Sequence, residues 1–132
     1  MTKILVAIIF VLTTTQTSAQ VDRKQNDNTS MQNTTGVTYR LFPTQNMWTF
    51  LKLNTRTGQI WQVQFSMKSD SRFVTNLNSE ALVSKDKETN DRFTLYSTQN
   101  MYTFILFDQF DGKTWQVQWS TDANNRGIIA IE

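Results

Sequence analysis

The side chains with the clearest capacity for chemistry are four glutamines that recur in pairs. Gln62 and Gln64 alternate with apolar residues in one segment, and Gln116 and Gln118 do so in another. A glutamine amide offers donors and an acceptor together, so such a row could bind the hydroxyls of a sugar. Alternating polar residues are also what the solvated face of a sheet requires, and the pattern favours this plainer interpretation.

Three aromatic residues widen this set of candidates. Trp48 and Tyr102 occupy equivalent places in predicted strands next to the glutamines, where either ring could stack on a bound sugar. Phe110 lies beside Asp111 and Gly112 at a predicted hairpin tip. It could anchor a partner there or fold back on its own hairpin, and the sequence leaves both open.

A Thr-Gln-Asn run also occurs twice, at 44–46 and at 98–100. Polar side chains on a loop can bind ligands. Thr and Asn side chains also shape turns by bonding to nearby backbone groups, and we favour that role here.

The composition argues against catalysis and against a metal site. The chain has no His and no Cys, which removes the usual general base and the thiol nucleophile. Its acidic residues fall mostly in predicted turns and linkers, so they form no facing pair of the kind a glycosidase needs. Asp108, Asp111 and Asp122 could supply oxygen ligands to calcium, but no loop matches a calcium-binding signature. We therefore expect a protein that is not an enzyme and that has no cofactor or metal.

The strongest pattern in the chain is an internal repeat with a constant offset of 54 residues. The run TQNM at 44–47 returns at 98–101, and WQVQ at 61–64 returns at 115–118. Between 39–78 and 93–132, 14 of 40 positions are identical without a gap. A match of this length indicates a duplicated structural unit.

Each repeat reads as four short strands with period-two alternation. Gly58 and Gly112 fall in the central hairpin loops, where a positive φ is needed. The linker between the repeats contains Ala81–Val83, which could add a short edge strand. The predicted strands are 38–42, 47–53, 60–65 and 72–77 in the first repeat, and 92–96, 101–107, 114–119 and 127–131 in the second.

The third strand of each repeat predicts which side chains form the core. Trp61, Val63 and Phe65 should point inward in the first repeat, with the glutamines outward. Their counterparts Trp115, Val117 and Trp119 should do the same in the second. We expect Trp61 and Trp115 to be core anchors in both copies.

These elements predict an all-β fold of two tandem four-stranded antiparallel repeats. The two repeats could close into one small barrel, or pack as a sandwich with pseudo-twofold symmetry. A third possibility is a pair of propeller-like blades, which would need oligomerisation to complete a ring.

The N-terminal region has the pattern of an export signal. Lys3 precedes the apolar run 4–12, and a small, polar stretch ends at Ala19, which predicts a cleaved signal peptide over residues 1–19. Residues 20–36 are almost wholly polar and predict a flexible tether. The remaining single domain, 37–132, comprises repeat one (37–78), a linker (79–91) and repeat two (92–132).

The hairpin FLKLNTRTGQIW at 50–61 resembles the pattern Phe-Leu-Leu-Asp-Thr-x-Thr-Gly-x-x-Trp of small exported bacterial β-repeat proteins. In those proteins a strand of the form Arg-Phe/Tyr-x-Leu comes first, and residues 39–41 and 92–95 stand in for it here. The resemblance covers both repeats. It implies a β fold and export, and it implies no particular chemistry.

The sequence thus predicts an exported, periplasmic or secreted interaction module. We expect its partner to be a protein of the cell envelope or the extracellular space, with a glycan bound at two equivalent sites as the alternative. Thirteen basic and eleven acidic side chains leave the charge nearly balanced, so we expect no nucleic-acid partner. The nine apolar residues at 4–12 are too few to cross a bilayer, so we also expect no membrane span.

Overall fold

The computed structural model of the protein describes residues 36–132. The predicted signal peptide lies outside the described residues, as does all of the predicted tether except Gly36. Within the described part, the regular structure is β-strand and short 3₁₀ turns, with no α-helix.

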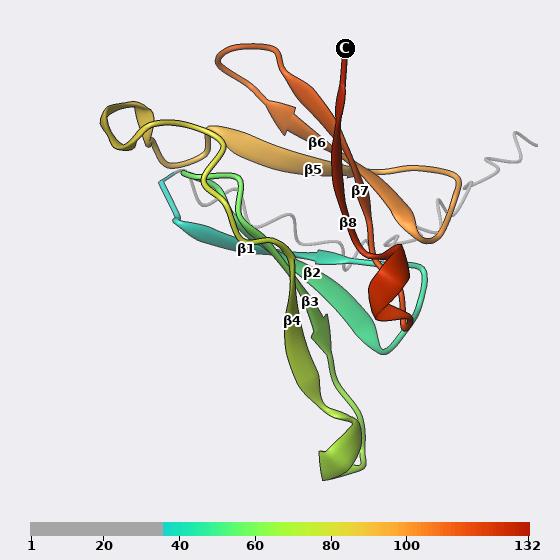
Figure 1. Cartoon of the computed structure of the whole chain (residues 1–132). Coiled ribbons are helices and arrows are strands. Elements are labelled where there is room, and N and C mark those ends of the chain that lie inside the picture. Colours follow the sequence, from blue (N-terminus) through green and yellow to red (C-terminus); the bar gives the residue numbers. More distant parts are fainter. Residues whose placement is uncertain (1–35) are drawn as a thin grey trace, which may run out of the picture. The chain divides into compact units, whose positions relative to one another are not determined.

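Eight strands form two separate antiparallel sheets, one from each repeat (Figure 1). Both sheets have simple meander order, β1-β2-β3-β4 and β5-β6-β7-β8. The all-β, two-repeat prediction is confirmed, and every strand lies within two residues of its predicted bounds. The strands are β1 (Tyr39–Pro43), β2 (Thr49–Asn54), β3 (Ile60–Gln64), β4 (Phe73–Asn78), β5 (Phe93–Ser97), β6 (Thr103–Asp108), β7 (Thr114–Gln118) and β8 (Gly127–Ile131).

The central hairpin loop of the first repeat has the turn chemistry that its sequence predicts. Gly58 has φ +79°, and its backbone N–H donates to the carbonyl of Asn54 at 3.0 Å. A Cβ at this position would lie 2.7 Å from Cδ1 of Leu82, so the linker packs directly on the glycine. The predicted edge strand at Ala81–Val83 is wrong: Leu82 makes one bond to the carbonyl of Thr57 and forms no ladder.

The two sheets are not closed into a barrel; they pack on one another as a sandwich-like pair. Strand β2 approaches β5, and β4 approaches β8. The space between the sheets holds one apolar core, which both repeats supply. Its fully or nearly fully buried members are Leu51, Leu53, Ile60, Leu77, Phe93, Leu95, Phe104, Leu106, Val117 and Trp119.

The two repeats bury opposite faces of their sheets. In the first sheet the buried side chains are Leu51, Leu53, Ile60 and Gln62. Their counterparts in the second sheet, Ile105, Phe107, Thr114 and Gln116, are partly or fully exposed. The reverse holds for the other face, which is buried in the second sheet and not in the first. Its buried residues in the second sheet are Leu95, Leu106, Val117 and Trp119, and their counterparts in the first are Leu41, Lys52, Val63 and Phe65.

The sheets are therefore stacked front to back. This differs from the pseudo-twofold symmetry expected from the sequence, since a twofold axis between the sheets would bury equivalent residues of each repeat.

The inward orientation predicted for the first repeat is thus wrong. Trp61 and Val63 are only half-buried and Phe65 is exposed, while Gln62 is completely buried. Lys52 supplies a physical reason, because it shares the face of Trp61 and burying an unpaired ammonium group is costly. In the second repeat Leu106 takes the place of Lys52, so the corresponding face can be buried. The predicted orientation holds there for Val117 and Trp119, and Trp115 packs against the core while remaining partly exposed.

Thr55 joins the two repeats by backbone and side-chain hydrogen bonds. Its carbonyl accepts from the N–H of Phe93 at 2.8 Å, at the start of β5. Its hydroxyl accepts from the N–H of Asp91 at 3.0 Å and donates to the carbonyl of Val37 at 2.8 Å. Arg40 adds an ion pair to Asp91 at 2.6 Å. These contacts hold the central hairpin loop and β1 of repeat one against the start of repeat two.

The unequal burial of Phe65 and Trp119, which are equivalent positions, gives a direct test of the packing. Trp119→Ala should lower the free energy of unfolding by about 3–5 kcal/mol, because Trp119 is 1% exposed and its Nε1 donates to the carbonyl of Met101 at 2.8 Å. Phe65→Ala should cost about 1 kcal/mol, since Phe65 is 42% exposed. Urea unfolding of the two variants measures the difference, and equal losses would contradict the inversion of faces.

Candidate functional site

The four glutamines predicted as one binding set lie in different environments. Gln62 is fully buried, and its Oε1 accepts from the N–H of Ser120 at 3.3 Å. Its Nε2 finds no hydrogen-bond partner among residues 36–132. Gln64 is half-buried and accepts from the Thr49 hydroxyl at 2.8 Å. The first pair thus belongs to the joint between the sheets, where a ligand has no access to Gln62.

The second pair, Gln116 and Gln118, lies on an outer surface. Gln116 is exposed and Gln118 half-buried, on the face of β7 that turns away from the core. We call this outer surface of the second sheet the glutamine face. It is formed by Tyr96, Ile105, Phe107, Gln116, Gln118, Ile129 and Ile131.

A shallow hollow of about 300 Å³ lies at one end of the glutamine face. Both Gln116 and Gln118 line it, and the turn between β7 and β8 contributes further amide groups. The other lining residues are Asn124, Asn125, Arg126, Gly127, Ile128 and Ile129.

The aromatic candidates do not accompany the glutamines. The Trp48 ring lies 5.2 Å from that of Phe65, and the Tyr102 ring lies 5.0 Å from that of Trp119. Because side chains alternate along a strand, Phe65 and Trp119 belong to the faces opposite the glutamines. Neither ring is therefore placed to stack on a sugar held by the neighbouring amides.

The two Thr-Gln-Asn turns have the turn-shaping role that we favoured. The Thr44 hydroxyl donates to the carbonyl of Thr49 at 2.9 Å, and the Oδ1 of Asn46 accepts from the N–H of Trp48 at 2.9 Å. The second repeat has the same bonds at the same distances, from Thr98 and to Asn100.

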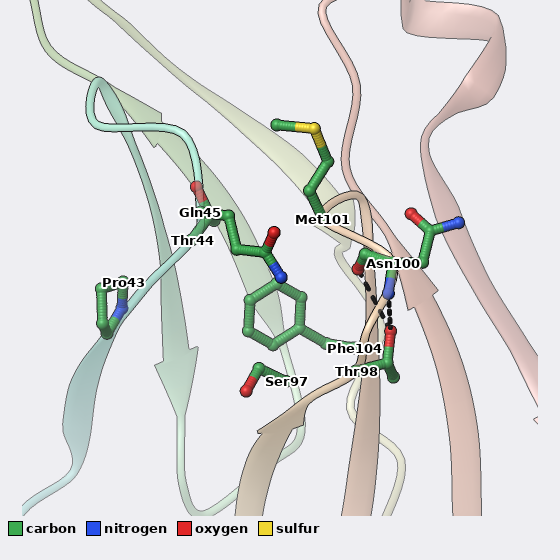
Figure 2. A pocket seen from close by; sticks show the side chains of 8 residues that line it. All are labelled: Pro43, Thr44, Gln45, Ser97, Thr98, Asn100, Met101 and Phe104. Atoms are coloured by element: carbon green, nitrogen blue, oxygen red, sulfur yellow. Dashed lines mark hydrogen bonds between the residues drawn. The ribbon is translucent and has the colours of Figure 1, made fainter.

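The two turns also line a common hollow of about 150 Å³ (Figure 2). The ring of Phe104 lies between the chains of the two turns. The lining residues are Pro43, Thr44, Gln45, Ser97, Thr98, Asn100, Met101 and Phe104.

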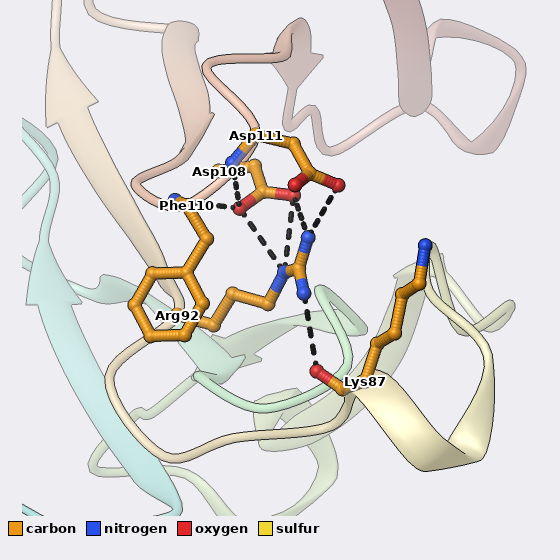
Figure 3. A network of polar contacts seen from close by, with 5 residues as sticks. All are labelled: Lys87, Arg92, Asp108, Phe110 and Asp111. Carbon is orange, nitrogen blue, oxygen red and sulfur yellow. Dashed lines mark hydrogen bonds and ion pairs between the residues drawn. The ribbon is translucent and has the colours of Figure 1, made fainter.

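A buried ion pair holds the hairpin that carries Phe110 (Figure 3). The guanidinium of Arg92 donates to both carboxylate oxygens of Asp108, at 2.8–3.1 Å, and to Asp111 at 2.6 Å. Both Arg92 and Asp108 are nearly inaccessible to solvent. Phe110 is 60% exposed, and its ring centroid lies 5.4 Å from the Arg92 guanidinium carbon. The residue therefore leans over the ion pair of its own repeat while leaving most of its surface open.

The environment of Asp108 lowers its pKa below the ordinary value of 3.8. Burial alone would raise the pKa, but the hydrogen bonds from Arg92 and from the backbone N–H groups of Phe110 and Asp111 outweigh it. The same bond to Asp108 raises the pKa of Arg92. This pair is a structural ion pair, whose charge is held in the folded state.

The outer surface of the first sheet is the feature that the sequence reasoning missed. We call it the aromatic face. Tyr39, Leu41, Phe65 and Val74 on it are 42–61% exposed. Lys52 lies among the rings, with its Nζ 4.5 Å from the Trp61 ring centroid and 5.9 Å from that of Tyr39. The face is formed by Tyr39, Leu41, Phe50, Lys52, Trp61, Val63, Phe65 and Val74. A sequence signal existed, because β2 carries apolar residues on both of its sides.

The lowered pKa of Asp108 leads to a prediction about acid stability. A carboxylate with a depressed folded pKa stabilises the fold above its unfolded pKa, and this stability is lost as the pH falls through the folded value. The free energy of unfolding should therefore drop as the pH falls below about 4. Asp108→Asn should cost about 3–5 kcal/mol at neutral pH and make the acid slope shallower.

The control for this prediction is Asp70→Asn, in the exposed turn before β4. It should keep the wild-type slope in urea titrations between pH 2 and 7. An unchanged slope in the Asp108 variant would show that the ion pair is not what responds to acid.

Within the described residues, no cluster of three or more His, Cys, Asp or Glu side chains is placed to hold a metal ion. Nor does that part of the chain contain a helix long and apolar enough to cross a membrane. In comparisons with known proteins, no family model, no curated protein and no solved structure matches the chain.

Proposed function

We propose that this chain is an exported, non-enzymatic interaction module that binds a protein partner in the cell envelope or outside the cell. The observation that carries the proposal is the aromatic face of the first sheet. It gathers four exposed apolar residues around the half-buried Trp61, Phe50 and Val63 on one continuous sheet surface. Contiguous apolar surface of this kind marks interaction sites in soluble proteins.

The composition of the aromatic face suits a protein partner. Tyr and Trp are enriched in protein interfaces because they bring large contact areas with few rotatable bonds. The face extends over all four strands of the first sheet, so it offers a broad surface to a partner. Lys52 adds one cation among the rings, where a partner's carbonyl or carboxylate oxygen could meet it.

Export is the second half of the proposal, and it rests on the sequence pattern of residues 1–19. The hairpin's resemblance to exported bacterial β-repeat proteins supports the same address. The absence of cysteine fits either a periplasmic or a secreted protein, because the ion pair and core described above stabilise the fold without disulfides.

A glycan-binding role is the second candidate, and the amide-lined hollow on the glutamine face is the observation that favours it. Gln116, Gln118, Asn124 and Asn125 supply several donors and acceptors to one small depression. Its counterpart in the first repeat is covered at Gln62, so this role would use one site rather than two. Binding to insoluble polysaccharides that disappears in the Gln116→Ala, Gln118→Ala double variant would establish it.

The protein-binding proposal predicts a partner whose capture depends on the aromatic face. The chain, tagged at its C-terminus and expressed with its own leader in its native host, should recover a stoichiometric protein after mild cross-linking. Leu41→Asp combined with Val74→Asp should reduce this recovery about tenfold or more, because both side chains are over half exposed on the face and a new charge must be desolvated.

The matched control is Ala81→Asp, at an exposed position in the linker between the repeats. It should retain the partner. Recovery that is equal in both variants, or no protein recovered by the wild type under any condition, would refute the proposal.

A further inference from the structure

The two sheets pack through faces that are not equivalent in the repeat. The face that is buried in one sheet is therefore exposed in the other. The glutamine face of the second sheet is the counterpart of the surface that carries Leu51, Leu53 and Ile60 in the core. The aromatic face of the first sheet is the counterpart of the surface that carries Leu106 and Val117. The molecule therefore has two outer faces, and the equivalent faces of the opposite repeats pack against each other in its core.

The residue types at the outer faces repeat much of that internal fit. Phe50 and Val63 on the aromatic face are identical to the buried Phe104 and Val117. On the glutamine face, Ile105 stands where the core has Leu51. Exposed apolar side chains reach the edges of both faces, with Leu41 61% exposed on one and Ile129 69% exposed on the other, as Tyr39, Ile131 and Tyr96 also are to about half.

One hydrogen bond between the two sheets joins residue types that recur at the equivalent positions of the opposite repeats. Gln62 accepts a hydrogen bond from the N–H of Ser120 at 3.3 Å. The equivalent residues, 54 positions away in the sequence, are Gln116 and Ser66, which are the same residue types. Gln116 lines the open 300 Å³ hollow, whereas the turn at Ser120 reaches the corresponding Gln62 in the first sheet. The hollow is thus the place where a Ser66 turn from outside would be received.

We propose that copies of this chain associate head to tail, with the glutamine face of one copy seated on the aromatic face of the next. This inference rests on the proposed function, because it names the partner of the aromatic face. The argument for a second copy over other occupants is continuity with the internal interface: the outer contact would join the same two kinds of face in the same order.

The symmetry of such a contact follows from the difference between its two sides. Unlike faces make a heterologous contact, which repeats until a ring closes or continues as an open chain. Rings of stacked four-stranded sheets typically contain about 4–8 sheets, which would require about two to four copies of this two-sheet chain.

Lys52 makes the proposed contact weaker than the internal one. Its counterpart Leu106 is fully buried, so a copy docking on the aromatic face must partly desolvate the ammonium group. The Trp61 ring, 4.5 Å from Nζ, offsets part of that cost. The internal joint is permanent because it lies within one chain, whereas the outer contact should respond to protein concentration.

Sedimentation velocity on residues 20–132, from about 1 µM to about 1 mM, tests the proposal. The wild type should form species larger than one chain as the concentration rises. Leu41→Asp on the aromatic face and Ile129→Asp on the glutamine face should each remain monomeric, and both should keep their fold because the side chains are exposed. Ala81→Asp, at an exposed position in the linker between the repeats, should associate like the wild type. Lys52→Leu should shift association to concentrations at least about tenfold lower.

Mixing the two monomeric variants gives the sharpest outcome. The Leu41→Asp chain keeps an intact glutamine face, and the Ile129→Asp chain keeps an intact aromatic face. An equimolar mixture should therefore form a one-to-one dimer that grows no further. A dimer formed by either variant alone would overturn the head-to-tail arrangement, since it would show that a face binds its own kind.

A wild type that stays monomeric throughout the concentration range would overturn the inference, whether the aromatic face is then covered by the chain's own residues 20–35 or by a different protein. The proposed function survives that result if the tagged chain still recovers a different protein in a manner that depends on Leu41 and Val74. Both fail together only if neither self-association nor a partner is found.

Discussion

The packing of Leu106, Val117 and Trp119 from the second sheet onto Leu51, Leu53 and Ile60 from the first is the interaction on which the rest of the structure depends. Neither four-stranded meander has a second layer of its own, and each needs the other to cover one apolar face. Because the faces that meet are not equivalent, the pairing also decides what the molecule shows to its surroundings. The aromatic and glutamine faces are the sides that this stacking leaves outside.

A single position explains much of the choice between faces. Lys52 in the first repeat and Leu106 in the second stand at the same place in the duplicated unit, and only the leucine can be buried without a charge partner. The choice has a cost on the other side, since the first sheet must bury Gln62, whose amide nitrogen is left without a partner in the described part of the chain. Thr55, Asp91 and Arg40 then hold the two sheets in this relation through backbone and ionic contacts.

The sequence predicted the strands well and their orientation poorly, and both results have physical causes. Period-two alternation and an ungapped offset report directly on backbone geometry, which is why β3, β7 and both Asn-capped turns were found. Alternation shows that a strand has two faces, but it does not identify the buried one when both carry apolar residues, as β2 does. The outward orientation expected of Gln62 was wrong for this reason, and the aromatic face went unnoticed because Trp61, Val63 and Phe65 on it were assigned to the core. The difference between Lys52 and Leu106, at equivalent positions of the two repeats, is the sequence signal that indicates which face each sheet buries.

The inversion of faces is the central claim, and thiol accessibility measures it most directly. The chain has no cysteine, so single reporters can be placed at equivalent positions with Gln62→Cys and Gln116→Cys, and with Val117→Cys and Val63→Cys. Under native conditions, and at concentrations low enough to keep copies apart, maleimide labelling should be at least about a hundredfold slower at position 62 than at 116, because a buried thiol reacts only when the structure opens. It should likewise be slower at position 117 than at 63. Equal labelling rates at positions 62 and 116 would contradict the account, since they would mean that both repeats expose the same face.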